Sequence, residues 1–242
     1  MAAGRDVREE VSAALGRAAV LRELARALDY PSSEARADVV GRWRAMLEAA
    51  AGWPEGVRPA LLQALEQLDG ADASLESEHV RLFGPAGRAA LTETSYGDAG
   101  RLLGKSAALA DVGGFYRAFG LKPGAEHPRP EDHLAFELEF LSVLAVKEAW
   151  AMSEGDEEAL EVTRDATGKF VREHVGTWID AWLAVLRASA PPPFYDALGE
   201  VIQRLVRAEC TRLAVEPRTV GSRVVDREVG DDVFICPRAV TS

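Results

Sequence analysis

The sequence predicts an all-α protein, a single-domain helical bundle over residues 1–213 followed by a non-helical C-terminal tail, residues 214–242. Three observations predict this fold. Apolar residues recur at steps of three and four in every long segment up to about residue 213, which is the spacing of one helix face. Proline, glycine and serine separate these segments. Hydrophobic residues make up 48% of the chain, enough to fill a core, and no long linker divides it.

Four helices are predicted in the first third of the chain, each with an apolar face and each ended by proline or glycine. The first spans residues 6–28 and ends at Tyr30-Pro31, and the second contains Trp43 and ends near Gly52-Trp53-Pro54. The third contains residues 61–68 and ends at Asp69-Gly70. The fourth begins at residue 72 or 74, runs to residue 83 and ends at Gly84-Pro85. A serine of the Ser32-Ser33 pair can cap the second helix.

Four more helices follow, separated by loops at residues 86–99 and 121–130. They span residues 102–119, 130 to about 152, about 158–188, which Pro191-Pro192-Pro193 stops, and about 195–213. Pro130 suits the first turn of the second of these, where Glu131 and Asp132 complement the positive helix end. In the tail, Val224-Val225 and Val233-Phe234-Ile235 are candidates for short strands or for an extended arm.

The charge and the cysteines restrict the kinds of partner and compartment. The formal net charge of −11 and a pI of about 5.0 disfavour nucleic acid as a partner and favour a basic peptide. Cys210 and Cys236 form neither a disulfide framework nor a zinc motif, so we expect two reduced thiols. The N-terminus lacks the apolar segment of a secretory signal, and no apolar run is long enough to span a membrane. We therefore expect a cytoplasmic protein.

The strongest candidate for chemistry is the segment 131–140, which reads EDHLAFELEF. His133 and Glu137 are four residues apart and share a helix face. Such a pair can hold a metal, transfer a proton or bind a basic ligand. The simpler interpretation is that Asp132 caps the helix and that His133 is a surface residue. Spacing alone leaves both interpretations open.

The sequence contains too few suitably spaced residues for a catalytic site. The histidines are His79, His127, His133 and His174, and they form no metal-binding motif. A catalytic metal needs three protein ligands, and only His133 and Glu137 can be placed together. No nucleophile motif and no phosphate loop occurs. The sequence therefore predicts no catalytic residue, no metal and no cofactor, with a helical metal-dependent hydrolase using His133 and Glu137 as the alternative function.

Two other segments stand out. Residues 78–85 end a helix at Phe83 and turn at Gly84-Pro85, and the simplest interpretation places Phe83 in the core. Tyr96 follows Thr94-Ser95 on a loop, where it either binds a partner or pins the loop.

Taken in order, four stretches resemble the assembly chaperones of the TorD, DmsD and NarJ type, which serve molybdenum oxidoreductases of the dimethyl sulfoxide reductase family. The stretches are residues 78–85, similar to Glu-Tyr-x-x-Leu-Phe-x-Gly-Pro but with His79 for the aromatic residue and one residue fewer before Gly84; Thr94-Ser95-Tyr96 with the helix end at residues 115–121; residues 130–140, similar to Glu-Pro-Asp-His-Leu followed by Glu-Leu-x-Phe; and residues 170–195, through Trp178 and Trp182 to Pro193-Phe194-Tyr195. The resemblance covers roughly residues 10–208 and leaves out the tail.

This resemblance implies a TorD-like fold of packed helices and a chaperone without enzymatic activity, acting as a monomer or homodimer. The implied partner is the catalytic subunit of a molybdenum-cofactor oxidoreductase. The chaperone would bind the twin-arginine leader peptide or the apo form of that subunit and hold it until cofactor insertion and export. Carboxylates would attract the arginines of the leader, and aromatic residues would contact its apolar part. The expected client-binding residues are Asp132, His133, Glu137, Tyr96, Phe83, Pro85, Tyr116 and Glu131.

Overall fold

The computed structural model describes residues 7–49, 53–54, 56–97, 102–122 and 129–221. These residues form helices and loops without a strand, which confirms the predicted all-α fold. The elements are α1 (Val7–Ala27), α2 (Ser33–Ala49), α3 (Val57–Asp69), α4 (Ser74–Phe83), the short 3₁₀ helix η1 (Glu93–Ser95), α5 (Leu102–Ala118), α6 (Leu134–Glu154), α7 (Glu157–Glu173), α8 (Val175–Ala188) and α9 (Pro193–Leu213). None of the helices in the described part is long and apolar enough to cross a membrane.

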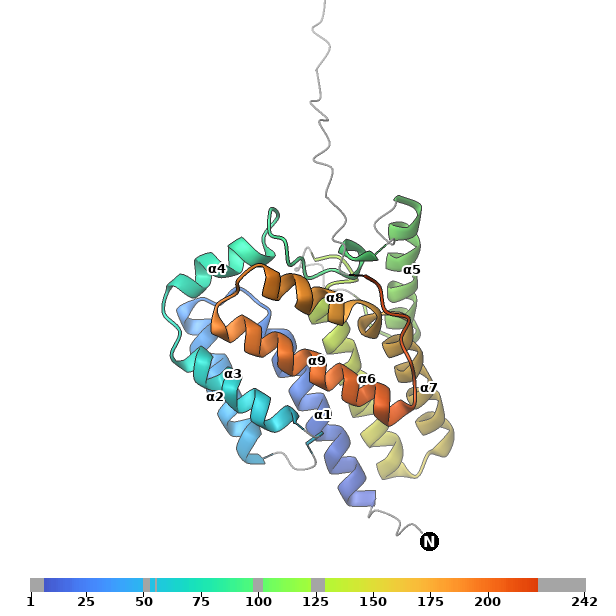
Figure 1. Cartoon of the computed structure of the whole chain (residues 1–242). Helices are drawn as coiled ribbons and strands as arrows, with labels where there is room; N and C mark the ends of the chain where they lie inside the picture. The colour runs from blue at the N-terminus through green and yellow to red at the C-terminus, as the bar shows by residue number, and fades with distance from the viewer. Residues whose placement is uncertain (1–6, 50–52, 55, 98–101, 123–128, 222–242) are drawn as a thin grey trace, which may run out of the picture.

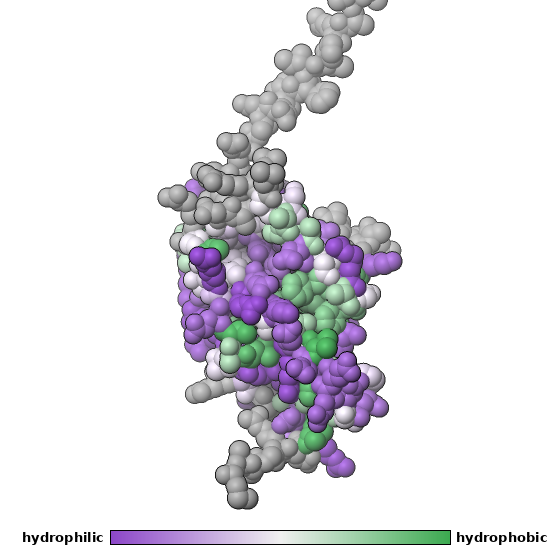
Figure 2. Space-filling view, turned by 90° about the vertical axis from the view of Figure 1, so that its right-hand side faces the viewer, coloured by the Kyte–Doolittle hydropathy of each residue, from purple (hydrophilic) through white to green (hydrophobic). Residues whose placement is uncertain are grey.

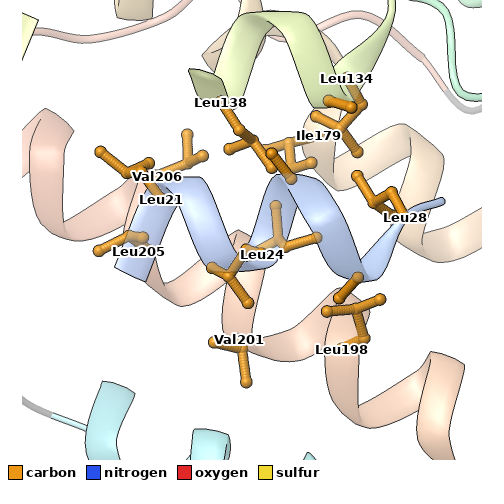
Figure 3. Packing of buried hydrophobic residues seen from close by; sticks show 14 of the residues in the cluster. Leu21, Leu24, Leu28, Leu134, Leu138, Ile179, Leu198, Val201, Leu205 and Val206 are labelled. Atoms are coloured by element: carbon orange, nitrogen blue, oxygen red, sulfur yellow. The ribbon is translucent and has the colours of Figure 1, made fainter. Parts of the chain in front are cut away.

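Helix α1 lies at the centre of the bundle (Figure 1). It packs along α6 and also touches α2 and α9, while α9 packs against α3, α8 and α7. Leu21 and Leu24 of α1, and Leu28 directly after its end, are each at most 2% exposed and lie on one apolar face. Figure 3 shows these leucines between Leu134 and Leu138 of α6 on one side and Val201 and Leu205 of α9 on the other. The three-and-four spacing seen in the sequence therefore marks the core.

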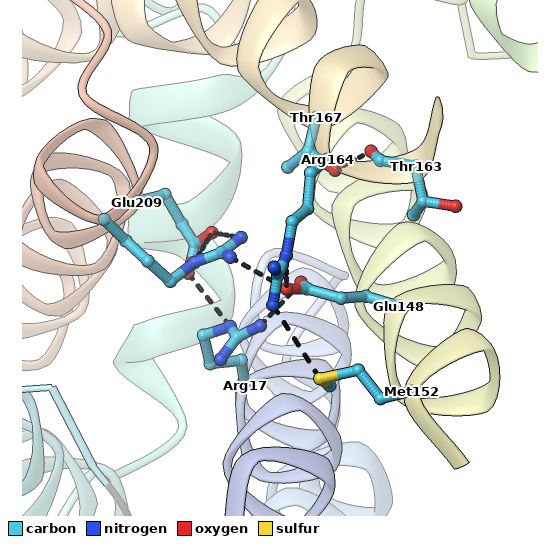
Figure 4. A network of polar contacts seen from close by, with 8 residues as sticks. Arg17, Glu148, Met152, Thr163, Arg164, Thr167 and Glu209 are labelled. Carbon is cyan, nitrogen blue, oxygen red and sulfur yellow. Dashed lines mark hydrogen bonds and ion pairs between the residues drawn. The ribbon is translucent and has the colours of Figure 1, made fainter. Parts of the chain in front are cut away.

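A network of charged residues around the buried Glu148, in the second half of α6, joins helices α1, α6, α7 and α9 (Figure 4). Glu148 on α6 accepts hydrogen bonds from Arg17 of α1 at 2.7 Å, Arg164 of α7 at 2.8 Å and Arg212 of α9 at 3.0 Å. Glu209 of α9 also pairs with Arg17 and Arg212. Burial alone would raise the pKa of Glu148, but the three arginines outweigh it and lower the pKa.

The start of α6 differs from the prediction. Pro130 was expected in the first helical turn, but the helix begins at Leu134. The preceding residues are bonded to the loop around η1 instead: Glu93 N donates to Asp132 O at 3.0 Å, and Leu134 N donates to Leu91 O at 2.8 Å. The cap is His133, whose Nδ1 accepts from Ala135 N at 3.2 Å, so the interpretation of Asp132 as the cap is wrong.

The helix predicted over residues 158–188 is two helices. It breaks at His174, whose backbone lies at φ −123° and ψ −104°, between α7 and α8. The ring Nδ1 of His174 lies 3.1 Å from Glu93 Oε2, so a distant loop fixes the residue at the break. Gly176 follows, and an added Cβ there would lie 2.3 Å from Val171 O. Only glycine allows the chain to turn this tightly after α7.

The last helix ends at Leu213 as predicted, and residues 214–221 continue without helix. The candidate strands at Val224-Val225 and Val233-Phe234-Ile235, and also Cys236, lie outside the described residues. Cys210 is a half-buried free thiol. On the side of the molecule that carries α5 and α7, Figure 2 shows separate apolar patches among hydrophilic residues.

Candidate functional site

The start of α6 has a buried side and an exposed side. Asp132 and Glu137 point inward and are each 0% exposed. His133 and Phe136 are half-buried and belong to the outer side. Residues that stand together in the sequence therefore divide into two groups with different surroundings.

On the buried side, Asp132 fixes the loop around η1. Its Oδ2 accepts hydrogen bonds from Thr94 N at 2.9 Å and from the Thr94 hydroxyl at 2.7 Å, whereas its Oδ1 has no hydrogen-bond partner. Next to it, the Tyr116 hydroxyl donates to the carbonyl of Glu131 at 2.9 Å. Tyr116 itself is 5% exposed and packs on Phe140. These contacts hold the segment before α6 between the η1 loop and α5.

Glu137 connects α6 to α8. Its Oε2 accepts from Trp178 Nε1 at 3.2 Å. Burial raises the pKa of Glu137 well above its ordinary value, and Glu93 and Asp132 raise it further, while the Trp178 hydrogen bond opposes the rise only in part. The side chain is thus an interior carboxyl group that favours its neutral form.

Tyr96 pins its loop to the bundle. Its ring stacks on Trp178 with centroids 5.3 Å apart, and its hydroxyl donates to Ala90 O at 2.8 Å. The residue is 1% exposed, and burial raises the pKa of its hydroxyl. Of the two roles considered for Tyr96, the structure supports pinning.

Four aromatic or imidazole rings from three parts of the chain meet in a cluster that extends from the buried Tyr195 to the exposed Tyr30. We call Tyr30, His79, Phe83 and Tyr195 the aromatic seam. His79 lies edge-on to Tyr30 at 5.7 Å and to Phe83 at 5.2 Å, and Phe83 lies edge-on to Tyr195 at 5.0 Å. The His79 ring nitrogen Nδ1 is 3.2 Å from the Tyr195 hydroxyl. Phe83 thus packs inside the seam and is only half-buried, while Pro85 is exposed in the turn that follows α4.

His133 is electrostatically linked to this seam. Burial, together with the charges of Arg129 and His79, lowers its pKa to about 4. Burial and Arg129 also lower the pKa of His79 to about 4, against the opposing effect of Asp29. Both rings are therefore neutral at pH 7 and do not repel a cationic ligand.

Beyond His133, a groove runs along α6. The rings of His133 and Phe136 are 6.1 Å apart, and Phe136 lines a groove of about 160 Å³. Its lining is mostly apolar and consists of Tyr116, Leu121, Lys122, Phe136, Glu139, Phe140 and Val143. Burial raises the pKa of the Glu139 carboxyl at its rim, as does the charge of Asp29, against the opposing charges of Arg129, Arg22 and Arg26.

A second carboxylate, Asp29, is near enough to Glu139 for its charge to raise the pKa of Glu139, and it pairs with Arg129 at 2.6 Å. Both members of this pair are partly open to solvent, with 49% of the Asp29 side chain and 30% of the Arg129 side chain exposed. The exposed side of α6 therefore combines an apolar groove, two neutral imidazoles and two accessible carboxylates.

The predicted residues thus separate in space. Asp132, Glu137, Tyr96 and Tyr116 support the start of α6 from within, whereas His133, Phe83, Pro85 and Glu131 are at least partly exposed. His133 and Glu137 bind different partners, and within the described residues no group of three or more histidine, cysteine, aspartate or glutamate side chains can hold a metal. The hydrolase alternative therefore gains no support.

Sequence reasoning missed Asp29, Tyr30 and Glu139, which reach the site from the end of α1 and from α6. No local pattern marks Asp29 or Tyr30, since they sit at an ordinary helix stop. His79 and Tyr195 did lie in two of the stretches that carry the resemblance. Their contact across 116 positions was not visible in the sequence.

Comparisons with known proteins place this chain in a family. Residues 50–184, more than half of the chain, match the family described as nitrate reductase delta subunit. The chain is 31% identical over 108 residues to the perchlorate reductase assembly chaperone protein of Dechloromonas aromatica (strain RCB), covering 45% of this chain and 47% of that protein. It is 30% identical over 150 residues to the selenate reductase assembly chaperone protein of Thauera selenatis, covering 61% and 75%. It is 26% identical over 145 residues to the chlorate reductase assembly chaperone protein of Ideonella dechloratans, covering 60% and 73%. The chain thus spans about half the length of the first relative and about three quarters of the other two.

Proposed function

The chain belongs to the nitrate reductase delta subunit family, and we propose that it is a cytoplasmic maturation chaperone, without enzymatic activity, for the catalytic subunit of a molybdenum-cofactor oxidoreductase. Three relatives are named assembly chaperones, each for a reductase of a different oxyanion. The chaperone binds the twin-arginine leader or the apo form of its client and holds it until cofactor insertion and export.

The observation that carries the leader-binding part is the exposed side of α6. Its groove is lined by Phe136, Phe140 and Val143, which suits the apolar segment of a leader. Glu139 lines that groove, and Asp29 lies within electrostatic range of Glu139. Both suit the arginines, because a guanidinium binds a carboxylate with two parallel hydrogen bonds.

The residues singled out in the sequence take two roles in this proposal. His133 and Phe83 lie on or beside the contact surface, with Pro85 and Glu131 at its edges. Asp132, Glu137, Tyr96 and Tyr116 set the position of α6 from beneath. In the structure described, the buried carboxylates cannot reach an arginine, so the direct ionic contact is assigned to Asp29 and Glu139.

Isothermal calorimetry tests the proposal. The full chain is titrated with a twin-arginine leader of a molybdoenzyme subunit from the same organism and with a twin-lysine leader. We expect micromolar or tighter binding that prefers arginine. Glu139→Gln removes one carboxylate charge and should weaken binding several-fold, whereas Glu158→Gln, an exposed change on α7, should not. Equal affinity for both leaders, or no effect of Glu139→Gln, would argue against this surface.

A further inference from the structure

The residues after α9 form a strap that runs back over the bundle. Ala214 turns the chain with φ at 52°, and Val215 N donates to Cys210 O at 3.0 Å. In residues 215–220, Val215, Pro217 and Val220 are half-buried while Glu216, Arg218 and Thr219 are exposed. Figure 1 shows this segment in red, leaving the end of α9 towards the end of the bundle that carries α5. The strap thus has an apolar inner face and a polar outer face.

Each inward residue of the strap sits over a glycine. An added Cβ on Gly168 of α7 would lie 3.4 Å from Val215 Cγ1, and one on Gly176 of α8 would lie 2.6 Å from Pro217 Cγ. At Gly97, in the loop after η1, it would lie 2.8 Å from Val220 Cβ. Gly97 also has φ +68°, which disfavours any other residue. Gly168 thus meets the strap at ordinary contact distance, whereas Gly176 and Gly97 leave space that the strap fills and that a side chain would occupy.

The end of the strap is tied to α8 by a hydrogen bond as well. Val220 N donates to Thr177 O at 2.9 Å. Thr177 lies one residue before Trp178, on which Tyr96 stacks. Val220 therefore bridges α8 and the loop that carries Tyr96.

That loop leads directly to the start of α6. Thr94 holds Asp132 through two hydrogen bonds, and Thr92 forms an isolated antiparallel bridge with His133. A continuous series of contacts thus joins Val220, Gly97, Thr94 and Asp132 to the cap residue of α6.

We infer that residues 215–220 are a latch that positions the loop 92–97 and, through it, the exposed side of α6. With the latch closed, the contact surface is preorganised and less ordering is needed on binding. With the latch open, the loop opens more often and leader affinity falls. The effect on affinity rests on the proposed function, whereas the effect on the loop does not.

The test compares the full chain with Val220→Gly, and with Thr219→Ala as the matched control on the outer face of the strap. Amide hydrogen exchange of residues 92–97 is followed by mass spectrometry, and leader affinity by calorimetry. We expect faster exchange in this loop and several-fold weaker leader binding for Val220→Gly, and neither change for Thr219→Ala.

Unchanged exchange at residues 92–97 in Val220→Gly would overturn the latch. Faster exchange with unchanged leader affinity would overturn its link to α6. Should the unmodified chain bind no leader, the proposed function fails by itself, and the exchange of the loop alone then decides whether the strap holds it.

Discussion

Replacing His133 by asparagine separates two properties of this side chain. The Nδ1 of His133 accepts the hydrogen bond from Ala135 N that caps α6, and the ring titrates with a pKa lowered to about 4. Asparagine is a good cap residue and does not titrate. We therefore expect His133→Asn to fold with similar stability at pH 7 and to lose less stability than the unmodified chain in mild acid.

The magnitude follows from the difference between the folded and unfolded pKa values. The unfolded histidine titrates near 6.5 and the folded one near 4, so the unfolded chain takes up the proton first as the pH falls. The contribution of the neutral His133 ring to the free energy of unfolding is fully present above pH 6.5 and is lost as the pH drops towards 4. Each pKa unit is worth about 1.4 kcal/mol, which gives about 2 kcal/mol between pH 7 and pH 5 and about 3 kcal/mol in full.

Urea unfolding followed by tryptophan fluorescence at pH 7 and pH 5 measures this difference. The lowered pKa of His79 is present in both proteins and adds a similar pH dependence to each of them. His133→Ala is the control, since it removes the cap as well: it should lose about 0.5–2 kcal/mol at pH 7 yet show the same weak pH dependence. Equal losses of stability between pH 7 and pH 5 in the unmodified chain and in His133→Asn would refute the reasoning.

Three further predictions follow from the contacts described. Arg129→Ala removes the internal partner of Asp29, so the leader should bind several-fold more tightly by calorimetry; unchanged or weaker binding would show that Asp29 is not a contact for the leader arginines. Glu148→Ala leaves three arginines without their shared carboxylate and should lower the free energy of unfolding by about 3–5 kcal/mol in urea titrations. The exposed pair of Lys169 with Asp165 provides the comparison, since Asp165→Ala should cost at most about 1 kcal/mol. Tyr96→Phe removes the hydrogen bond to Ala90 O but keeps the ring on Trp178, so the loss should be about 1 kcal/mol, and a much larger loss would mean that the hydroxyl holds more than this loop.

The helices were predictable because their signal is local. The apolar face of α1 is visible as leucines three and four residues apart, and its end is marked by Pro31. The family resemblance, built on four short stretches in a fixed order, is likewise confirmed by family membership. The division of the chain at residue 213 into a domain and a tail stays a prediction.

Two helix boundaries were predicted wrongly because residues far away in the sequence determine them. The break at His174 depends on Glu93, which is 81 positions away, while the apolar pattern runs through the break without interruption. The late start of α6 depends on Leu91 and Thr94, which take the backbone and side-chain hydrogen bonds that a helix starting at Pro130 would need. Local cap rules cannot anticipate such competition from another part of the chain.

The structure shows which residues of the candidate site are buried, and the sequence did not. The sequence singled out the segment 131–140 and placed Asp132 and Glu137 in contact with a partner, because carboxylates are rarely fully buried, but both side chains are 0% exposed. The assignment of Asp132 and Glu137 as client-binding residues stays a prediction, and in the proposal above they act by positioning α6. No pattern marks Asp29, and none separates Glu139 from its neighbours in the segment 131–140; only the packing of α1 against α6 brings the two together.

The two hydrogen bonds that Thr94 donates to Asp132 have a consequence for genetics. A screen for variants that fail to mature the client would collect two classes of mutation from one short stretch of gene. Substitutions at Asp132 would loosen the fold, so their defect should grow with temperature and be relieved by stabilising changes elsewhere. Substitutions at Glu139 would leave the fold intact, and their defect should be the same at every growth temperature and yield only to changes in the client.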